Sequence, residues 1–485
     1  MIFDFLLKLF LLLTLIHPIF LDASMQFSLK LSKDNLGVNL QNQSDLDWNL
    51  KGRPGQGYYT SVLIGTPPQQ NLKSVLDKMT NFAYFKVIAD KRKHHQQTHS
   101  STFKDLNVHI NVPYTQGHWE GNLGSDFITL PNVLNSTVKA NVACITESKD
   151  FFISTSDWQG ILGLAYKEIA RPDRSVEPYF DSLIKAGKSD NIFSIQLCGP
   201  FGHLYNDTGG VLVLGDIDSS LYLGDVTYTP ITREWYYEVV LTSIGVGNDT
   251  LDIQCIDLND DKTIIDSGTT NFRLPTNIFN KLVSSIKKKV KLSKTIPDRF
   301  WHGTKMMCWH NAEVIPWEDF PPIKLSLAHA WNSAFTITIA PQQYLRKMFD
   351  VDNETASHEC YKFAVDESKT GTVLGAVIME GFYVIFDRKE KRIGFGLSTC
   401  ARDYLPEPPS ISAPFFFNEP IKRCYKNPAK SGDDKLLIVA YVMATICIVL
   451  FIPMLFMLMQ WIWKNLIKAR FKCSDSSSDF AYLVQ

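Results

Sequence analysis

A weak internal repeat is the feature of this sequence that most restricts what the chain can fold into. In each half of the chain an aspartate follows a short apolar run, and two apolar residues with a glycine come further along. One aspartate per half, in the same local setting, predicts two related lobes that face each other. The two sets are Asp77 with Val75-Leu76 and Ile161-Leu162-Gly163, and Asp266 with Thr263-Ile264-Ile265 and Val373-Leu374-Gly375.

The pattern between these motifs predicts an all-β architecture. From Gly57 onward, short runs of alternating apolar residues are broken by Gly, Pro and Asn, as in strands that are separated by turns. The clearest helices are expected over Glu177–Ala186 and Asn277–Val290, with Lys287–Lys289 as the solvated end of the second. We therefore expect a bilobal, mostly β fold with a cleft between its lobes.

The residues around Asp266 suit a catalytic aspartate. Gly268 permits a sharp turn that aims the carboxylate outward, and the neighbouring hydroxyls fix its orientation. Two such carboxylates held together cannot both ionise easily, so they share a proton around one water. One then activates the water against a peptide carbonyl while the other protonates or polarises that carbonyl, and no metal or cofactor is needed. The alternative is an aspartate in an ordinary turn at the end of a strand.

A hairpin-like stretch lies between the two aspartate motifs. Val112–Gly121 contains two short strands around a tip with a glycine, and Tyr114 and Trp119 flank that tip. A plain surface hairpin would explain the pattern. Its place between the two aspartates favours a flap that closes over a substrate and excludes water.

The two ends of the chain predict a secreted protein with a membrane anchor. Residues 1–24 have the length and order of a secretory signal peptide, with an uncleaved anchor as the alternative. Residues 436–463 are 28 residues without a charge, more than the roughly 20 that cross a bilayer. Lysine and arginine follow this run, and such residues stay in the cytoplasm, so the N-terminus is expected outside, in the type I orientation.

The remaining segments are expected as follows. Residues 25–54 are a short pro-segment or lead-in, and residues 55–230 are the N-terminal lobe with the flap. Residues 231–405 are the C-terminal lobe, 406–435 a stalk, and 464–485 a cytoplasmic tail. The tail ends with an acidic residue shortly before Leu-Val, which resembles an endosomal sorting signal or carries no address at all.

Cysteines and sequons agree with a lumenal or extracellular body. Six cysteines in the second half of the ectodomain form an even set, which predicts three disulfides of open connectivity: Cys198, Cys255, Cys308, Cys360, Cys400 and Cys424. Cys144 is left over and is expected as a buried thiol. No His/Cys cluster has the spacing of metal ligands. Glycosylation is predicted at the five N-x-S/T sequons of Asn42, Asn135, Asn206, Asn248 and Asn353.

Several long motifs resemble the membrane-bound, beta-secretase branch of the pepsin-like aspartic protease family. The similarity begins at about Gly55 and continues through the charge-free run, which contains the similar segment IVAYVMATIC. Motifs of this length in this order are specific to the family. They are DSGTTNFRLP, VPYTQGHWEG, GILGLAYKEIARPD, REWYYEV, PQQYLR, GAVIMEGFYVIFDR and KRIGF.

The resemblance implies roles for the catalytic and flap residues. Asp77 and Asp266 match the first and second catalytic aspartates. Tyr114 matches the flap tyrosine over the cleft, and Trp119 matches its hydrogen-bonding support. Thr115-Gln116 would form the flap tip, whose backbone meets the substrate.

The resemblance also implies substrate contacts and a disulfide pattern. Gly268 and Thr269 would contact a bound extended strand. Arg273 matches a subsite arginine that favours polar or acidic side chains, with a surface cation on a strand as the alternative. The cysteine pattern implies the pairs Cys198–Cys400, Cys255–Cys424 and Cys308–Cys360, and Cys144 has no counterpart in the family.

The first aspartate motif departs from the family pattern. The family has Asp-Thr-Gly-Ser-Ser-Asn-Phe, whereas this chain has Asp77-Lys78-Met79-Thr80-Asn81-Phe82, without the glycine and one residue shorter. Glycine is the residue best able to make the turn, and an ammonium beside the two aspartates opposes their shared proton. Three explanations stay open: an enzyme that tolerates the shorter loop, a protein that binds peptides without cutting them, or a wrongly joined exon.

The expected function is therefore a membrane-anchored aspartic endopeptidase that cleaves membrane or secreted proteins. The alternative is a catalytically impaired relative that acts as a peptide-binding or scaffold protein. The formal net charge is −1 and no basic stripe suggests nucleic acid, so no nucleic-acid partner is expected. The catalytic body is expected in the lumen or outside the cell, at an endosome, the Golgi or the plasma membrane.

Overall fold

The computed structural model of the chain describes most of the body and the C-terminal helix, within the unit Asp47–Gln485. The described residues are 50–53, 57–77, 83–86, 100–113, 117–131, 133–134, 136–149, 160–204, 208–292, 296–310, 315–348, 358–401, 408–417, 420–425 and 433–475. The predicted signal peptide, most of the predicted pro-segment and residues 476–485 of the predicted tail lie outside these residues.

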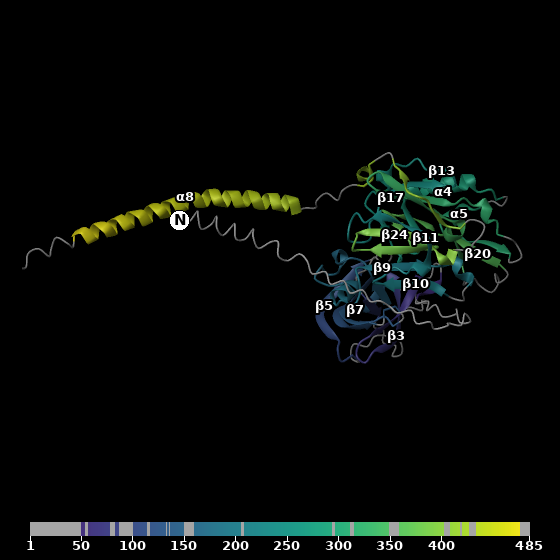
Figure 1. Cartoon of the computed structure of the whole chain (residues 1–485), viewed down its shortest axis with the longest axis horizontal. Helices are drawn as coiled ribbons and strands as arrows, with labels where there is room; N and C mark the ends of the chain where they lie inside the picture. The colour runs from purple at the N-terminus through teal and green to yellow at the C-terminus, as the bar shows by residue number, and fades with distance from the viewer. Residues whose placement is uncertain are drawn as a thin grey trace, which may run out of the picture. The chain divides into compact units, whose positions relative to one another are not determined.

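A 13-stranded sheet contains strands from both halves of the chain (Figure 1), in the order β11-β24-β23-β9-β10-β1-β2-β3-β8-β4-β7-β6-β5. In this sheet β23, from the end of the body, pairs antiparallel with β9 from its first half. The bounds are β1 (Leu50–Arg53), β2 (Gly57–Ile64), β3 (Gln69–Asp77), β4 (Ala83–Lys86), β5 (Lys104–Pro113), β6 (His118–Thr129), β7 (Thr137–Lys149), β8 (Gly160–Gly163), β9 (Ile192–Leu197), β10 (Thr208–Leu214), β11 (Tyr222–Pro230), β23 (Phe382–Asp387) and β24 (Arg392–Ser398).

Three smaller sheets complete the second half of the body. The largest has six strands, namely β12 (Leu241–Val246), β13 (Asp249–Thr250), β17 (Ile323–Ala330), β18 (Ser333–Ile339), β25 (Ser410–Ile411) and β26 (Phe415–Phe416). A four-stranded sheet contains β14 (Thr263–Ile265), β22 (Thr372–Leu374), β15 (Phe272–Pro275) and β21 (Val365–Ser368). A three-stranded sheet contains β16 (Met307–His310), β20 (His358–Phe363) and β19 (Leu345–Met348).

Helices are few in the described part of the body. They are α2 (Tyr179–Lys185), α3 (Cys255–Leu258), α4 (Thr276–Lys289), α5 (Asp298–Trp301), α6 (Pro341–Tyr344) and α7 (Ala376–Met379), with the 3-10 turns η2 (Lys167–Ile169), η3 (Gly199–Leu204), η4 (Ser219–Leu221), η5 (Trp317–Asp319), η7 (Thr399–Ala401) and η8 (Ile421–Arg423). The two helices expected from the sequence correspond to α2 and α4. Helix α4 buries Ile278, Leu282 and Ile286, four residues apart, and ends in its lysine run, as an amphipathic helix on a core should.

The core extends through both halves of the body. Phe193 of β9 stacks on Phe386 of β23 at 4.8 Å, and Tyr237 packs edge-on against the same ring at 4.8 Å. The hydroxyl of Tyr237 donates to the carbonyl oxygen of Leu164 at 2.6 Å, which satisfies its polar end. The expected all-β fold is thus confirmed, with strands of the two halves joined in one sheet and one core.

Three disulfides tie the body together. They join Cys198 with Cys400, Cys255 with Cys424, and Cys308 with Cys360, at Cα–Cα distances of 5.4, 4.8 and 4.0 Å. These are the pairs that the resemblance implies. Cys144 is fully buried in β7 and belongs to none of the three pairs.

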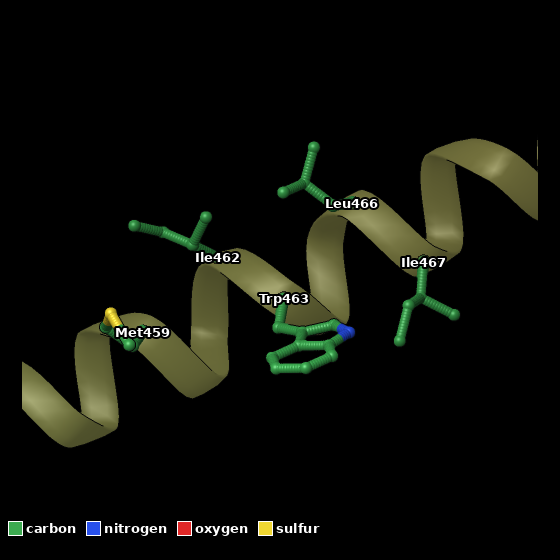
Figure 2. Close-up of a pocket in the computed structure, with 5 residues that line it drawn as sticks. All are labelled: Met459, Ile462, Trp463, Leu466 and Ile467. Carbon is green, nitrogen blue, oxygen red and sulfur yellow. The ribbon is translucent and has the colours of Figure 1, made fainter. Parts of the chain in front are cut away.

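A long apolar helix, α8 (Asp433–Asp475), follows the body and contains the charge-free run. Its segment Tyr441–Ile467 has 27 residues and a mean hydropathy of 2.7, so by length and composition it could cross a membrane. At about 1.5 Å per residue it spans about 40 Å, more than the roughly 30 Å of a hydrocarbon core. A groove on this helix is lined by its own side chains (Figure 2), namely Met459, Ile462, Trp463, Leu466 and Ile467. Such apolar side chains suit contact with lipid.

Candidate active site

Asp266 lies directly after β14, and its own loop holds its carboxylate. The carboxylate oxygen Oδ1 accepts from the backbone N–H of Gly268 at 3.0 Å, and Oδ2 accepts from the hydroxyl of Thr269 at 2.6 Å. The side chain is only 1% exposed, and the backbone N–H of Asp266 donates to the carbonyl oxygen of Leu374 at 3.0 Å. Hydrogen bonds to the ionised form stabilise a carboxylate at a buried position.

Gly375 is the residue that lets this loop close against β22. A Cβ atom at Gly375 would lie 2.6 Å from the carbonyl oxygen of Thr269, and it would also clash with the carbonyl oxygen of Asn271. The same loop accepts a hydrogen bond from the backbone N–H of Ala376 to the carbonyl oxygen of Thr269 at 2.7 Å. Only glycine allows this close approach of two backbone segments.

Asp77 occupies the same place in the backbone of the first half. Strand β3 runs parallel to β8, and Asp77 lies opposite Gly163. In the second half β14 runs parallel to β22, and the last pair of this ladder is Ile265 with Leu374. Asp266 and Gly375 are the next residues of these two segments. Each aspartate therefore faces a glycine at the end of a parallel strand pair. The two motifs of the internal repeat are two copies of one backbone arrangement.

The third strand of each copy has the same spacing from its aspartate. Tyr84 of β4 and Arg273 of β15 take equivalent register positions, seven residues after the aspartate in both halves. By strand register, Ala83 therefore corresponds to Phe272. An alignment of the two sequence motifs instead pairs Phe82 with Phe272. Strand β4 is thus shifted by one residue relative to the sequence match, which offsets the residue that the first motif lacks.

A polar network fixes the C-terminal end of the second aspartate motif, at Asn271. The side-chain amide of Asn271 donates to Asp366 Oδ2 at 2.7 Å, and its oxygen accepts from the guanidinium of Arg346 at 2.9 Å. Both partners come from other strands, β21 and β19. Asn271 is therefore fixed on both sides of its amide, which stabilises the loop that begins at Asp266.

The same arginine approaches a buried glutamate that connects the two halves of the body. Glu380, which is 3% exposed at the junction of α7 and β23, accepts a hydrogen bond from the hydroxyl of Tyr58 on β2 at 2.6 Å. Burial raises the pKa of Glu380 to about 7, while the hydrogen bond from Tyr58 and the charge of Arg346 act in the opposite direction. Gln343 donates to the carbonyl oxygen of Glu380 at 2.6 Å.

The other predicted substrate contacts are partly within the described residues. Gly268 is exposed and Thr269 is half-buried, so both are open to a ligand at the loop. Arg273 is half-buried on β15, and within the described part of the chain its Nε has no hydrogen-bond partner. Trp119 is fully buried in β6 opposite Val112 of β5, at the base of the flap hairpin. The flap residues Tyr114, Thr115 and Gln116 and the loop residues 78–82 lie outside the described residues.

One predicted glycosylation site can be examined. Asn248 is exposed at the turn between β12 and β13, and its amide oxygen accepts from the ammonium of Lys324 at 3.5 Å. Asn42, Asn135, Asn206 and Asn353 lie outside the described residues.

Sequence reasoning missed four residues of the supporting network: Tyr58, Asn271, Arg346 and Glu380. One signal was available, because Glu380 is a single acidic residue inside the apolar run Ala376–Phe386. A charge in such a run is expected to be paired or hydrogen-bonded. Its partners lie far away in the sequence, so the pattern alone could not name them.

The arrangement suits acid–base chemistry by carboxylates. Among the described residues no group of three or more His, Cys, Asp or Glu side chains is placed to hold a metal ion. The donors around Asp266 come from a backbone N–H and a hydroxyl, which orient a carboxylate without neutralising it.

Comparisons with known proteins agree with this geometry. The family model "Eukaryotic aspartyl protease" matches residues 57–398. The chain is 41% identical over 451 residues to "Beta-secretase" of Strongylocentrotus purpuratus, which covers 87% of this chain and 82% of that protein. It is 28% identical over 240 residues to "Pepsin II-1" of Oryctolagus cuniculus, covering 47% of this chain and 57% of that protein. It is 29% identical over 236 residues to "Chymosin" of Camelus dromedarius, covering 47% and 58%.

Proposed function

Because this chain belongs to the eukaryotic aspartyl protease family, in its beta-secretase-like branch, we propose that it is an aspartic endopeptidase anchored in a membrane by α8. Its substrates are membrane or secreted polypeptides near the surface of that membrane. Anchoring confines enzyme and substrate to one plane and so raises their effective concentration. The observation that supports this most is the matched backbone setting of Asp77 and Asp266, each opposite a glycine.

Asp77 and Asp266 form the catalytic dyad in this proposal. One carboxylate accepts a proton from a bound water, whose oxygen attacks the peptide carbonyl carbon. The other, protonated, donates its proton to the carbonyl oxygen, which gives a diol. The first carboxyl then passes its proton to the amide nitrogen, and the C–N bond breaks as a diol hydroxyl returns a proton to the second carboxylate. Gly268 and Thr269 keep Asp266 oriented by their hydrogen bonds. Since one carboxyl has to stay protonated, mildly acidic compartments suit the reaction.

Substrate binding is assigned to the flap and to the loop of Asp266. Tyr114, Thr115 and Gln116 cover the peptide, with Trp119 behind them, while Gly268 and Thr269 pair with its backbone. Arg273 favours a polar or acidic side chain, and its unpartnered Nε within the described residues supports this role. The three disulfides, exposed Asn248 and the apolar helix support a lumenal or extracellular body of type I topology, with the endosome, Golgi or plasma membrane as its place.

The test uses the full chain in detergent or membrane discs with a fluorogenic peptide library in mildly acidic buffer. We expect turnover that Asp266→Asn abolishes and that the matched control Asp225→Asn, at an exposed aspartate of β11, leaves unchanged. Turnover that persists in Asp266→Asn would contradict the assignment.

A second candidate function rests on the first motif. Lys78-Met79-Thr80 replace the family's Thr-Gly-Ser-Ser, which favours a protein that binds extended peptides without cutting them. Restoring Thr-Gly-Ser-Ser after Asp77 separates the two. If only the restored chain cleaves peptides, and the natural chain binds them, the second candidate is correct. The transcript sequence across Val75–Phe85 shows whether the stretch is natural.

A further inference from the structure

Exposed aromatic side chains gather at one place on the C-terminal lobe. Trp331 is 60% exposed at the turn between β17 and β18, and Phe416 is 68% exposed in β26. The two segments are in contact, because β26 pairs with β18 with Phe416 opposite Ser333. Phe415 lies opposite buried Ala334, so its side chain leaves the other face of the strand. Single exposed apolar residues are ordinary, but neighbouring large rings on a folded surface indicate a site of contact with a membrane or with another protein.

Basic side chains stand beside these rings. Lys422 and Arg423 of η8 are both exposed, and the ammonium of Lys422 lies 5.0 Å from the centre of the Trp331 ring. The sequence from residue 421 to residue 432 contains four cations and no acidic residue. These cations are Lys422, Arg423, Lys426 and Lys430. Aromatic rings beside cations suit contact with a lipid bilayer, whose interior is apolar and whose headgroups carry phosphate.

The body holds this surface rigidly. The backbone N–H of Phe417 donates to the carbonyl oxygen of Asn332 at 2.8 Å, and that of Ile421 donates to the carbonyl oxygen of Trp331 at 3.1 Å. Ile421 is 7% exposed, and the disulfide from Cys424 to Cys255 closes the segment. The exposed rings therefore belong to the folded lobe and not to a loose stalk.

The length of the chain limits how far this surface can be from the bilayer. Tyr425 still packs against the lobe, and α8 begins at Asp433. Eight residues span at most about 29 Å when fully extended. The charge-free run begins three residues later, at Leu436. The anchor therefore keeps the residues next to Tyr425 within that distance of the start of α8.

We propose that Trp331, Phe416, Lys422 and Arg423 form a docking patch that rests in the headgroup region of the bilayer that α8 spans. The rings take the interfacial position that aromatic residues favour in membranes, and the cations bind phosphate oxygens of the lipids. Docking orients the catalytic lobe against the bilayer and so sets the height at which a membrane-bound substrate is cut. Docking itself rests only on the proposed anchoring by α8, while its effect on cleavage rests also on the proposed protease activity.

The first experiment asks whether the docking patch touches lipid. The full chain is placed in membrane discs with benzoylphenylalanine at position 416, and lipid adducts are measured by mass spectrometry after illumination. The control carries the same group at Leu106, which is 36% exposed on β5. We expect at least a tenfold excess of lipid adducts at 416, in discs of phosphatidylcholine alone and in discs with added phosphatidylserine. A rise with phosphatidylserine assigns the attraction to net lipid charge, and equal yields assign it to the phosphate common to both.

Two results of this experiment would overturn the proposal. One is a lipid yield at position 416 no higher than at 106, and the other is an adduct to a second copy of the chain instead of lipid. Neither result depends on protease activity, so a failure of the proposed function leaves this test intact.

The second experiment asks what docking does. Trp331→Ser combined with Phe416→Ser is expected to leave the Tm and the cleavage of a short soluble peptide unchanged, because both side chains are mostly in solvent. Cleavage of a membrane-anchored peptide in the same disc should fall about three- to tenfold as the lobe loses its fixed orientation. Equal cleavage of the anchored peptide by the double variant and the natural chain would contradict the role in orientation.

Discussion

At the residue scale, the hydroxyl of Thr269 donates a hydrogen bond to the carboxylate of Asp266 at 2.6 Å. We predict that Thr269→Val, which keeps the shape and removes the donor, lowers kcat/KM by about 10- to 100-fold. A hydrogen bond to a charged group contributes about 1.5–3 kcal/mol, which corresponds to that range. Steady-state kinetics on a short peptide measure the effect.

Thr269→Ser is the matched control for this prediction. It keeps the hydroxyl and loses only a methyl group, so it should retain most of the activity. Equal losses in the valine and serine variants would show that Thr269 acts through packing and not through its hydrogen bond.

Glu380 makes the stability of the body depend on pH. The pKa of Glu380 is raised from 4.5 to about 7 in the folded chain, with burial as the main cause. The folded state therefore binds this proton more tightly than the unfolded chain does. The contribution of Glu380 to the free energy of unfolding is fully present below pH 4.5 and is lost as pH rises through 7. The difference between the two pKa values corresponds to about 3 kcal/mol.

We predict that Glu380→Gln removes this part of the pH dependence. Unfolding of the full chain is followed from pH 5 to pH 8, and the natural chain should lose up to about 3 kcal/mol more than the variant across that range. The difference between the two chains isolates Glu380 from other titrating groups. Parallel curves for the two chains would show that Glu380 does not titrate there.

At the element scale, the unit of construction is three strands, with an aspartate at the C-terminal end of the first and a glycine at the C-terminal end of the second. This unit occurs as β3, β8 and β4 and again as β14, β22 and β15. The internal repeat in the sequence predicts the unit, since it places both aspartates and both glycines. It could not predict the register of β4, because a one-residue slip is decided by strand pairing and not by local preference.

We predict that Gly375→Ala damages the active site from the neighbouring strand. The new Cβ would lie 2.6 Å from the carbonyl oxygen of Thr269, so the loop of Asp266 has to move. Displacements of about 1 Å can cost about 100-fold in rate, and we expect a loss of that order in kcat. Peptide turnover measures it.

Gly245→Ala in β12 is the matched control. Its nearest atom beyond chain neighbours would be 3.2 Å from the new Cβ, and Gly245 lies in the six-stranded sheet and not in the active-site loops. This variant should keep its turnover. A Gly375→Ala variant as active as this control would mean that the loop does not need the close approach.

At the scale of the whole molecule, the chain passes from Tyr425 of the body to Asp433 of α8 through residues 426–432, which lie outside the described residues. We predict that a chain ended after Gly432 leaves the cell, while the full chain stays in the membrane fraction. The apolar segment Tyr441–Ile467 supplies the anchor, since all of its described side chains are exposed to the surroundings. Fractionation of cells and medium measures the result. A truncated chain that remains with the membranes would show that another segment anchors it.

The sequence by itself determined the features that are local or countable. The motif Asp-Ser-Gly-Thr identifies Asp266 together with the residues that orient it. The charge-free run predicts an apolar helix, and the six cysteines of the ectodomain predict three disulfides. The family followed from the order of its motifs. The cysteine pairs needed the family resemblance, because spacing alone permits many pairings.

Only the tertiary structure decided the partners that lie far apart along the chain. Asp77 meets Gly163 through a parallel pairing, Arg346 reaches Asn271 from 75 residues away, and Glu380 reaches Tyr58 from 322 residues away. The internal repeat indicates one aspartate in each half, but the structural equivalence of Asp77 and Asp266 follows only from the matching registers of their strands. Register and long-range packing follow from how whole sheets assemble, and no local pattern of side chains contains that information.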